Sequence, residues 1–453
     1  MATITNRLDK FIATHQKSKE LWERSLKTSR GIHHDSRHTI PFPVYTAKAE
    51  GSRKWDVDGN EYIDYTMGHG SLILGHAHPT LIEAVSQQIT RGTHYGTENE
   101  LAVEWAEQIR QLVPAAERVE FVVSGTEANI MIAQLARAYT RRNKILKFAR
   151  HFFGWSDDLY VGVVPPHDKP IAGRLPPFTD DAVSGATVVI PCNDEVAMEK
   201  ALAKKDIAAL FLEGGGAHGG AICMPPGLVK KARQLTQKYG TLLVIDEVIS
   251  GFRWSPGGYQ ATVGVTPDLS PLGKIVGGGL GGGAAVCGHA DIMEQLKIKP
   301  GDAEWNRYRR IMHNGTWNAN PLIAAAGVTM LKIVAKGEVQ KVAATSAKKL
   351  ADGINKKIEQ RGIAGCAYNT SSVLHIHLGK CQKCNRSICL DANKVTPPEV
   401  IQALNWHLLL NGVNLLRGVV GWVSAVHSKE DIEQTIDAFG SALDGMIAEN
   451  VIK

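Results

Sequence analysis

The stretch Thr241-Leu-Leu-Val-Ile-Asp246-Glu247-Val248-Ile-Ser-Gly-Phe-Arg253 decides the fold of this 453-residue chain. Its apolar run is typical of a buried strand in a parallel sheet, and the strand ends in two carboxylates, Asp246 and Glu247. Ligands of open α/β sheets bind outside the carboxyl ends of the strands. We therefore expect a binding site beside Asp246.

A single lysine further along the chain suggests what this site binds. Lys274 stands in Asp268-Leu-Ser-Pro-Leu-Gly-Lys274-Ile-Val-Gly-Gly-Gly-Leu-Gly-Gly-Gly283, between a predicted turn and a run of small residues. A lysine acts as an amine nucleophile when a crowded, partly dry site lowers its pKa. Pyridoxal phosphate needs such a lysine for a Schiff base, and an acid against its pyridinium nitrogen. Lys274 and Asp246 together indicate this cofactor.

A third motif could hold the phosphate of that cofactor. Val119-Glu-Phe-Val-Val-Ser124-Gly125-Thr126-Glu127-Ala-Asn129 passes from a predicted strand through a turn into a helix. Free N–H groups and the helix dipole make such a helix start an anion site. The alternative is a plain N-cap with Glu127 in the first turn. With the lysine and the acid in the same chain, we favour phosphate binding by Ser124, Gly125 and Thr126.

The composition is that of an ordinary globular protein, with 44% hydrophobic and 21% charged residues. A net charge of +6 without a Lys/Arg run argues against nucleic acid binding and fits a small anionic substrate or cofactor. No secretory signal is recognised, and no uncharged apolar stretch reaches the ~18 residues of a membrane span. Seven cysteines without a signal peptide indicate reduced thiols, so we expect a cytoplasmic protein.

The spacing of apolar residues predicts an α/β fold with two or three lobes. A lead-in helix is expected at the N-terminus, followed by an antiparallel meander over residues 42–65 with turns at Gly51 and Asp58-Gly59. From about residue 80, helices and strands alternate, which argues for a mostly parallel sheet covered on both faces. The predicted helices are 79–91, 98–112, 126–141, 195–204 and 226–239, and the predicted strands are 119–123, 144–148, 187–190, 208–212, 241–245 and 284–288.

Six motifs follow one another in the order found in a known enzyme family. They are Trp55-Asp-Val-Asp-Gly-Asn-Glu-Tyr-Ile-Asp64, Gly75-His-Ala-His78-Pro79, Ser124-Gly-Thr-Glu-Ala128, Ile245-Asp-Glu-Val-Ile-Ser-Gly-Phe-Arg253, Leu272-Gly-Lys274 and Asn314-Gly-Thr-Trp-Asn-Ala-Asn-Pro321. Over nearly its whole length the chain resembles class III of the pyridoxal phosphate-dependent aminotransferases, a family that includes aminomutases.

The resemblance implies a fold and an assembly. The fold would be α/β, the pyridoxal phosphate-dependent transferase fold type I. A large cofactor-binding domain with a mostly parallel sheet would span residues 76–330. A smaller α+β domain would be built from both termini, with residues 1–75 as the N-terminal segment and part of that domain and residues 331–453 completing it. The family further implies a homodimer with active sites at the subunit interface.

The resemblance also implies roles for individual residues. Lys274 would carry the cofactor and then move the proton on the substrate's Cα, and Asp246 would keep the pyridine nitrogen protonated. Val248 would pack on one face of the ring. Thr316 would reach the phosphate from the partner subunit, opposite the helix start described above.

Two departures from the family pattern bear on the reaction. Phe152-Phe153-Gly154 stands where the family usually has Tyr-His-Gly, so Phe152 can stack on the ring but brings no hydroxyl. Glu213 is followed by Gly214-Gly215-Gly216 where many relatives have Glu-Pro, so Glu213 is expected beside the cofactor on a loop of different shape.

Substrate recognition is expected to rest on arginine, because its planar fork binds a carboxylate or phosphonate through two hydrogen bonds. By resemblance, Arg37 falls where aminomutases carry a substrate-binding arginine, and Arg417 falls where some class III aminotransferases carry another. His33 would add positive character, and Tyr95 lies in a loop that often lines the substrate side. The alternative for either arginine is a surface or interdomain ion pair.

The stretch His375-x-His377-x3-Cys381-x2-Cys384-x4-Cys389 has no counterpart in the resemblance. Four thiolate or imidazole ligands can hold zinc, but a lone Cys-x2-Cys is weak evidence, so we predict no metal site. The run Gly277-x-Gly279-x2-Gly282 likewise does not follow a predicted strand and open a helix, so we prefer close backbone packing near Lys274 to dinucleotide binding.

The sequence therefore predicts a pyridoxal phosphate enzyme acting on a small anionic amine or amino acid. The leading hypothesis is an aminotransferase that moves the amino group to an oxo acid. One alternative is an ammonia-lyase that eliminates from a hydroxylated amine such as an amino phosphonate, and another is an aminomutase that shifts the amino group within one molecule. A non-catalytic binding protein of the same fold is disfavoured because Lys274 is present.

Overall fold

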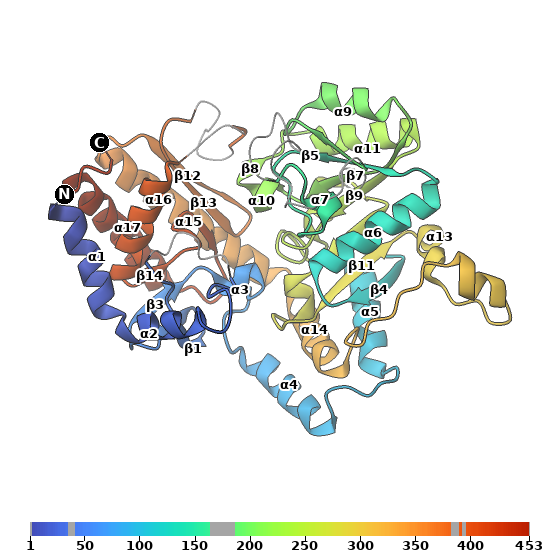
Figure 1. Ribbon diagram of the computed structural model, residues 1–453, viewed down its shortest axis with the longest axis horizontal. Helices are drawn as coiled ribbons and strands as arrows, with labels where there is room; N and C mark the ends of the chain where they lie inside the picture. The colour runs from blue at the N-terminus through green and yellow to red at the C-terminus, as the bar shows by residue number, and fades with distance from the viewer. Residues whose placement is uncertain (1, 35–40, 164–185, 382–388, 392–395, 453) are drawn as a thin grey trace. The chain divides into compact units, whose positions relative to one another are not determined.

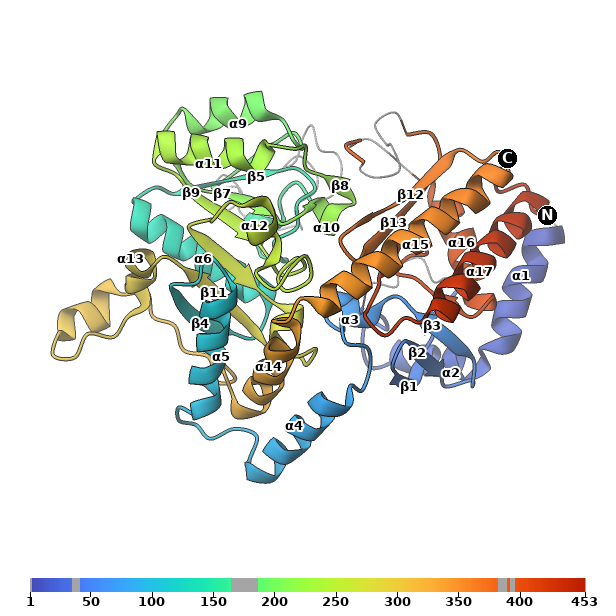
Figure 2. The same ribbon diagram turned by 180° about the vertical axis from the view of Figure 1, so that it is seen from behind.

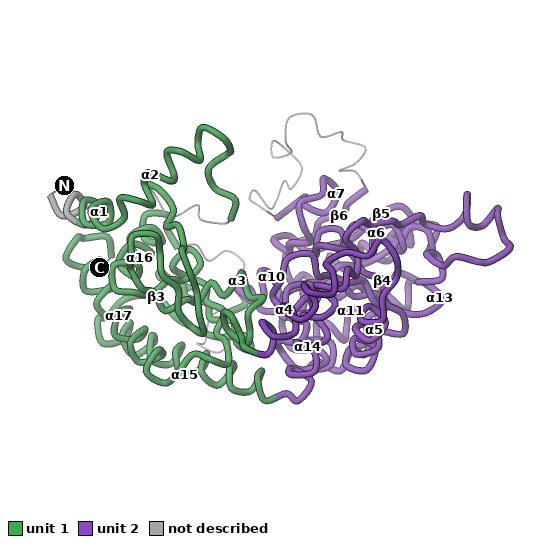
Figure 3. Tube along the Cα trace, turned by 90° about the horizontal axis from the view of Figure 1, so that it is seen from below, with its two compact units in different colours: residues 1–79, 338–453 green, residues 80–337 purple. Residues whose placement is uncertain are grey.

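The computed structural model describes residues 2–34, 41–163, 186–381, 389–391 and 396–452. The chain divides into two compact units, coloured separately in Figure 3: unit 1 is residues 1–79 with 338–453, and unit 2 is residues 80–337. The domain boundaries at 75/76 and 330/331 stay a sequence prediction.

Unit 2 is built on a seven-stranded sheet with the strand order β4-β11-β10-β9-β7-β5-β6 (Figure 1). Only β11 runs antiparallel to its neighbours among these strands, because β10, β9, β7, β5 and β6 pair in parallel. The mostly parallel sheet of the predicted fold class is therefore present. The strands are β4 Arg118–Val122, β5 Lys144–Phe148, β6 Thr187–Ile190, β7 Ile207–Glu213, β9 Leu242–Asp246, β10 Leu269–Leu272 and β11 Ala284–Gly288, with a separate short β8 at Ile222–Cys223.

Helices cover both faces of this sheet, as the alternation of elements predicts. On one face α6 and α13 pack on side chains such as Val244 and Val286, and on the other face α9 and α11 pack on Leu210 and Leu243 (Figure 2). The unit 2 helices are α4 Pro79–Arg91, α5 Glu100–Leu112, α6 Gly125–Thr140, α7 Asp157–Tyr160, α9 Glu195–Leu202, α10 Ala217–Gly220, α11 Leu228–Tyr239, α12 Gly258–Val263, α13 Ala290–Met293 and α14 Pro321–Val334, with short helical turns at Lys274–Gly277, Glu294–Leu296 and Trp305–Arg309.

Unit 1 contains two small sheets, β1-β2-β3-β14 and β12-β13-β15. The first holds the antiparallel meander expected over residues 42–65. The apolar core of unit 1 is formed by one face each of α15, α16 and α17 together with strands of both sheets. The elements are α1 Ala2–Thr14, α2 Gln16–Ser25, β1 Thr46–Glu50, β2 Arg53–Asp56, β3 Glu61–Asp64, α3 Met67–Gly70, α15 Glu338–Gln360, β12 Gly365–Thr370, β13 Val373–Leu378, α16 Pro398–Leu410, β14 Val413–Asn414, β15 Val420–Trp422 and α17 Lys429–Ala448.

The lead-in helix is two helices, because the chain breaks at His15. Its backbone leaves the helical region at φ −134°, and its buried ring lies 2.7 Å from the hydroxyl of Tyr62 and 2.8 Å from the carbonyl oxygen of Phe11. A buried ring fixed by two partners thus sets the bend between α1 and α2. In the described part of the chain, no helix has both the length and the apolar content needed to cross a bilayer.

The glycine run after Lys274 serves close backbone packing. A Cβ placed on Gly277 would lie 2.7 Å from the Cα of Gly283, and one placed on Gly278 would lie 2.7 Å from the backbone of Ala326. Backbone segments can approach this closely only where side chains are absent. Gly281 differs, since a Cβ there would meet nothing within 4 Å.

Substituting Gly277→Ala should lower the free energy of unfolding by about 1–3 kcal/mol, because the methyl group overlaps the facing backbone. Gly281→Ala is the matched control, and its effect should stay within about 0.5 kcal/mol. Denaturant unfolding of both variants measures the difference. Equal stability of the two variants would contradict the packing role of this segment.

Candidate active site

A cavity of about 150 Å³ lies in unit 2 at the carboxyl end of the sheet. Its walls come from the ends of β7 and β9, the start of α6, the loop after β5, and Lys274, two residues after β10. The lining residues are Gly125, Thr126, Asn129, Phe152, Gly154, Glu213, Gly214, Asp246, Val248, Ile249 and Lys274.

Asp246 is the last residue of the fully buried strand β9 and is itself 6% exposed. Its Oδ2 accepts a hydrogen bond of 2.7 Å from Asn129 Nδ2, and its Oδ1 accepts one of 2.8 Å from the N–H of Val248. Burial raises the pKa of Asp246 to about 6, and these two hydrogen bonds oppose the rise. The carboxylate is therefore oriented and poorly hydrated, as an acid facing a ring nitrogen must be.

Glu213 ends the neighbouring strand β7 and lies directly across from Asp246 in the sheet. Its Oε1 accepts from the N–H of Phe152 at 2.6 Å and its Oε2 from the N–H of Gly219 at 3.2 Å. Burial raises the pKa of Glu213 to about 8, with a further contribution from the charge of Asp246. Of these two neighbouring acids, Glu213 thus holds a proton at neutral pH more readily.

Lys274 stands two residues after the end of β10 and lines the cavity. Its φ is 53°, a left-handed conformation that non-glycine residues seldom adopt. Burial lowers the pKa of Lys274, and the charges of Asp246 and Glu213 oppose this effect. A lysine amine with a lowered pKa is more often neutral and nucleophilic.

The start of α6 forms the wall where a phosphate was expected. Gly125 and Thr126 line the cavity, whereas Ser124 does not: its hydroxyl accepts a hydrogen bond of 3.2 Å from the N–H of Glu127 and caps the helix. The capping alternative therefore describes Ser124. Close packing also accounts for two small residues, since a Cβ on Gly154 would lie 2.6 Å from Thr126 Oγ1 and one on Gly125 would lie 2.9 Å from Val248.

The residues present fit pyridoxal phosphate. The cavity brings together a desolvated lysine, a buried oriented acid, an aromatic ring on Phe152, an apolar side chain on Val248 and a helix start suited to an anion. These elements lie far apart in the sequence, and the sheet alone assembles them.

Asn129 lines the site and was not among the predicted residues. Its Nδ2 donates to the carbonyl oxygen of Gly125 at 3.0 Å as well as to Asp246. A usable signal existed: Asn129 follows Gly125 by four residues, so it faces the same side of α6 as the phosphate-binding end.

Besides Ser124, two predicted residues of unit 2 lie outside the cavity lining. Thr316 is exposed, and its carbonyl oxygen bonds the ring of His94, which packs edge-on against Trp317 at 5.0 Å. Tyr95 is 44% exposed, and its hydroxyl accepts from Gln88 at 2.9 Å. Within one chain, neither side chain contributes to the walls around Lys274.

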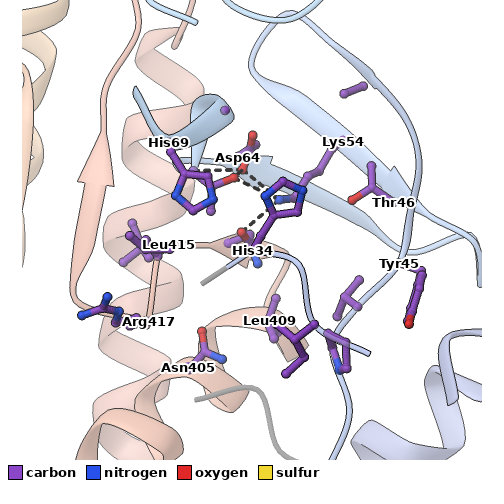
Figure 4. A pocket seen from close by; sticks show the side chains of 18 of the residues that line it. His34, Tyr45, Thr46, Lys54, Asp64, His69, Asn405, Leu409, Leu415 and Arg417 are labelled. Carbon is purple, nitrogen blue, oxygen red and sulfur yellow. Dashed lines mark hydrogen bonds and ion pairs between the residues drawn. The ribbon is translucent and has the colours of Figure 1, made fainter. Parts of the chain in front are cut away.

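Unit 1 has its own cavity, of about 480 Å³, between the meander and the segment after α16 (Figure 4). His33, His34 and Arg417 line it, so two of the predicted substrate residues, His33 and Arg417, share one pocket. Arg37 lies outside the described residues. Further polar lining residues are Lys54, Asp64, His69, His76, Asn405 and Asn414.

The one carboxylate among the described lining residues is already neutralised. Asp64 Oδ1 lies 3.0 Å from Lys54 Nζ, and its Oδ2 lies 2.8 Å from His76 Nε2. Lys54 and the hydrogen bonds from its neighbours overcome burial and hold the pKa of Asp64 well below its usual range. The guanidinium of Arg417 gives the described lining cationic character. Burial lowers the pKa of Arg417.

The two histidines of the stretch for which no metal site is predicted have threonine partners. His375 and His377 are buried on β13, His375 Nε2 lies 3.1 Å from Thr370 Oγ1, and His377 Nδ1 lies 2.8 Å from Thr396 Oγ1. Among the described residues, no three His, Cys, Asp or Glu side chains are placed to hold a metal ion.

A seven-stranded α/β sheet with a lysine and an acid meeting at its carboxyl edge defines a fold type I pyridoxal phosphate enzyme. Comparison with known proteins agrees, since residues 34–365 match the family model of the class III aminotransferases. The chain belongs to this family. The predictions of family, fold class and cofactor are thereby confirmed.

Similar proteins extend over almost the whole chain. Glutamate-1-semialdehyde 2,1-aminomutase of Ignicoccus hospitalis is 38% identical over 413 residues, covering 89% of this chain and 92% of that protein. An omega-transaminase from Sphaerobacter thermophilus has a similar structure, with 30% identity, a TM-score of 0.84 and coverage of 94% and 97%. A transaminase solved with PLP bound has 26% identity, the same TM-score of 0.84 and coverage of 96% and 99%.

The role of Asn129 can be tested through pH. Because the folded pKa of Asp246, about 6, exceeds its ordinary value of 3.8, its contribution to stability falls as pH rises between these values and is constant above them. Asn129→Leu removes a donor that stabilises the ionised form of Asp246 more than the protonated form. The bond to the carbonyl oxygen of Gly125 is lost as well, but that loss does not depend on pH. Cofactor-free protein should therefore lose about 1–3 kcal/mol more at pH 8 than at pH 5 in denaturant unfolding.

Asn355→Leu is the matched control. Asn355 is buried in unit 1 and exchanges two hydrogen bonds with the backbone of Ala367, which does not titrate. The free energy of unfolding that Asn355→Leu loses should be the same at both pH values. A loss for Asn129→Leu that is independent of pH would show that Asn129 does not support the charge on Asp246.

Proposed function

We propose that this chain is an enzyme that moves the amino group of a small anionic amine with pyridoxal phosphate, and that the amino group shifts within one molecule. The observation that carries the proposal is the desolvated Lys274 beside the oriented carboxylate of Asp246. The amino shift is favoured over transfer between molecules because eight relatives with 32–38% identity, each matched over at least 88% of this chain, are named as aminomutases.

The cavity residues would divide the chemistry. When bound, pyridoxal phosphate supplies a ring that accepts the electron pair left behind when a proton leaves the substrate carbon. Lys274 Nζ, with its lowered pKa, would take that proton and return it to the carbon on the other side of the amino nitrogen, a 1,3-shift. Asp246 would hold negative charge against the ring nitrogen, and Val248 and Phe152 would confine the ring and exclude water.

We further propose that Arg37, Arg417, His33 and Tyr95 bind the anionic group of the substrate. For Arg417 and His33 the support is their place in one cavity whose carboxylate, Asp64, is already paired. A guanidinium in a partly dry cavity binds a carboxylate, phosphonate or phosphate more strongly than one in water.

Two other reactions of the same site are specific alternatives. Transfer to an oxo acid is supported by the 30% identity to an omega-transaminase. Elimination of ammonia from a hydroxylated amine is supported by Glu213, which lines the cavity and whose pKa burial raises to about 8. Such an acid can protonate a departing hydroxyl group.

We also propose a homodimer in which Thr316 completes the phosphate site of the partner subunit. The support is its position within the chain: Thr316 is exposed and does not line the cavity around Lys274. Its segment also exposes apolar side chains, with Met312 at 63% and Trp317 at 60% exposure. Apolar side chains that are exposed together are typical of interaction surfaces.

Product analysis separates the three reactions. Holoenzyme is incubated with short amino aldehydes, amino acids and hydroxylated amines that carry a carboxylate, phosphonate or phosphate, with and without an oxo acid. An amino shift should give an isomer of the substrate without an oxo acid and without free ammonia. Products that appear only with an oxo acid would establish transfer instead, and stoichiometric ammonia without an acceptor would establish elimination.

Lys274→Ala is the essential control for this experiment. The variant should lose turnover by at least about a thousandfold, because the amine that moves the proton is gone. It should also lose the visible absorption of a lysine-bound cofactor. Turnover that survives in this variant would refute the proposed function in all three forms.

Arg417→Ala should raise the KM of the active substrate by about 10- to 100-fold with a smaller change in kcat, because a charged hydrogen-bond pair is lost. The KM of Arg417→Lys should lie between those of Arg417→Ala and the natural protein, because the charge remains but the planar fork is lost. Arg361→Ala is the matched control, because Arg361 pairs with Asp444 on the outside of unit 1. An unchanged KM in Arg417→Ala would remove this residue from the substrate site.

A further inference from the structure

The segment after β13 carries a pair of thiols that the proposed function does not use. Cys381 Sγ and Cys389 Sγ lie 3.6 Å apart. Cys389 is fully buried, whereas Cys381 is partly exposed. Two thiols in van der Waals contact, one of them reachable from solvent, form the arrangement that thiol–disulfide exchange requires.

The neighbourhood of this pair favours redox chemistry over metal binding. The two histidines of β13 are hydrogen-bonded to threonine hydroxyls, as described above. Asp391 lies beside the pair, with its Oδ2 3.8 Å from Cys381 Sγ. Among the described residues, no three His, Cys, Asp or Glu side chains are grouped to hold a metal ion, whereas the two sulfur atoms are in contact.

We propose that Cys381 and Cys389 form a reversible disulfide, and that the oxidant is a low-molecular-weight disulfide of the glutathione class. The thiolate of Cys381 attacks one sulfur of this disulfide, which releases one small thiol and leaves a mixed disulfide on Cys381. The thiolate of Cys389 then attacks Cys381 Sγ and releases the second small thiol. Two cysteine thiols are oxidised and one small disulfide is reduced to two thiols, so atoms and electrons balance.

The geometry assigns the order of these steps. The partly exposed Cys381 meets the oxidant first, and the buried Cys389 can react only with a sulfur already beside it. Bond formation needs the two sulfur atoms to approach by about 1.5 Å, to the ~2.05 Å of a disulfide. The bond would tie Cys389 to the segment that leaves β13 at Leu378.

Peptide mapping of the holoenzyme tests the proposal. The protein is incubated with oxidised glutathione, remaining thiols are blocked at acid pH, and the chain is digested with trypsin. Cleavage after Lys380, Lys383, Arg386 and Lys394 places the three cysteines in separate peptides: 381–383, 384–386 and 387–394. We expect peptides 381–383 and 387–394 to become joined, with the mass of two hydrogen atoms lost, and to separate again on reduction with dithiothreitol.

Two variants sharpen the result. Cys389→Ser should stop at one glutathione adduct on Cys381, because the second thiol is missing. Cys192→Ser is the matched control, since Cys192 is a partly buried cysteine of unit 2, and its linked peptide should be unchanged. If the natural protein keeps as much stable glutathione adduct as Cys389→Ser does, Cys389 does not resolve the mixed disulfide. This result would overturn the proposal.

Other outcomes would also overturn it. One is a link that involves peptide 384–386, and another is no link in oxidised glutathione. A third is one zinc ion per chain that protects these thiols until a chelator is added. The readout is the mass of peptides, so it is independent of which reaction the enzyme catalyses.

Discussion

The buried carboxylate of Asp246 is the constraint on which the active site depends. An ionised carboxylate removed from water is strongly disfavoured unless neighbouring groups bind it. The fold supplies Asn129 from α6 and the N–H of Val248 from the chain just beyond β9. Because one partner lies on α6 and the other follows β9 by two residues, the acid is oriented before any cofactor is present.

Glu213 makes this constraint tighter. It ends the strand next to that of Asp246, so the two acids lie side by side at one edge of the sheet. Neighbouring like charges resist ionising together. Behind Glu213, His151 Nδ1 accepts its N–H at 2.9 Å, and Lys147 Nζ donates to the carbonyl oxygen of Leu159 at 2.5 Å. Burial lowers the pKa of Lys147 to about 7. Within the cavity itself, the pKa rises from about 6 at Asp246 to about 8 at Glu213.

Much of this could be foreseen from the sequence because the signals are local. The strand that ends at Asp246 and the helix that starts at Gly125 follow from apolar runs and turn residues. The strand β10 before Lys274 was missed, because Pro271 cannot donate to a ladder and argues against a central strand. In the structure β10 lies between β9 and β11 all the same.

The parts that could not be foreseen depend on tertiary contacts. The contact of Asn129 with Asp246 joins residues 117 positions apart. The capping role of Ser124 instead of a place in the cavity wall, and the burial of both histidines of β13 behind threonine hydroxyls, are set by packing. No pattern along the chain reports which hydroxyl satisfies which ring.

The backbone of Lys274 shows how the fold treats its reactive residue. At φ 53° the chain adopts a shape that glycine takes without strain and lysine takes at a cost of about 1–3 kcal/mol. A position that folding alone would give to glycine is held by a long basic side chain. The surrounding chain must therefore be packed firmly enough to hold the residue in this conformation.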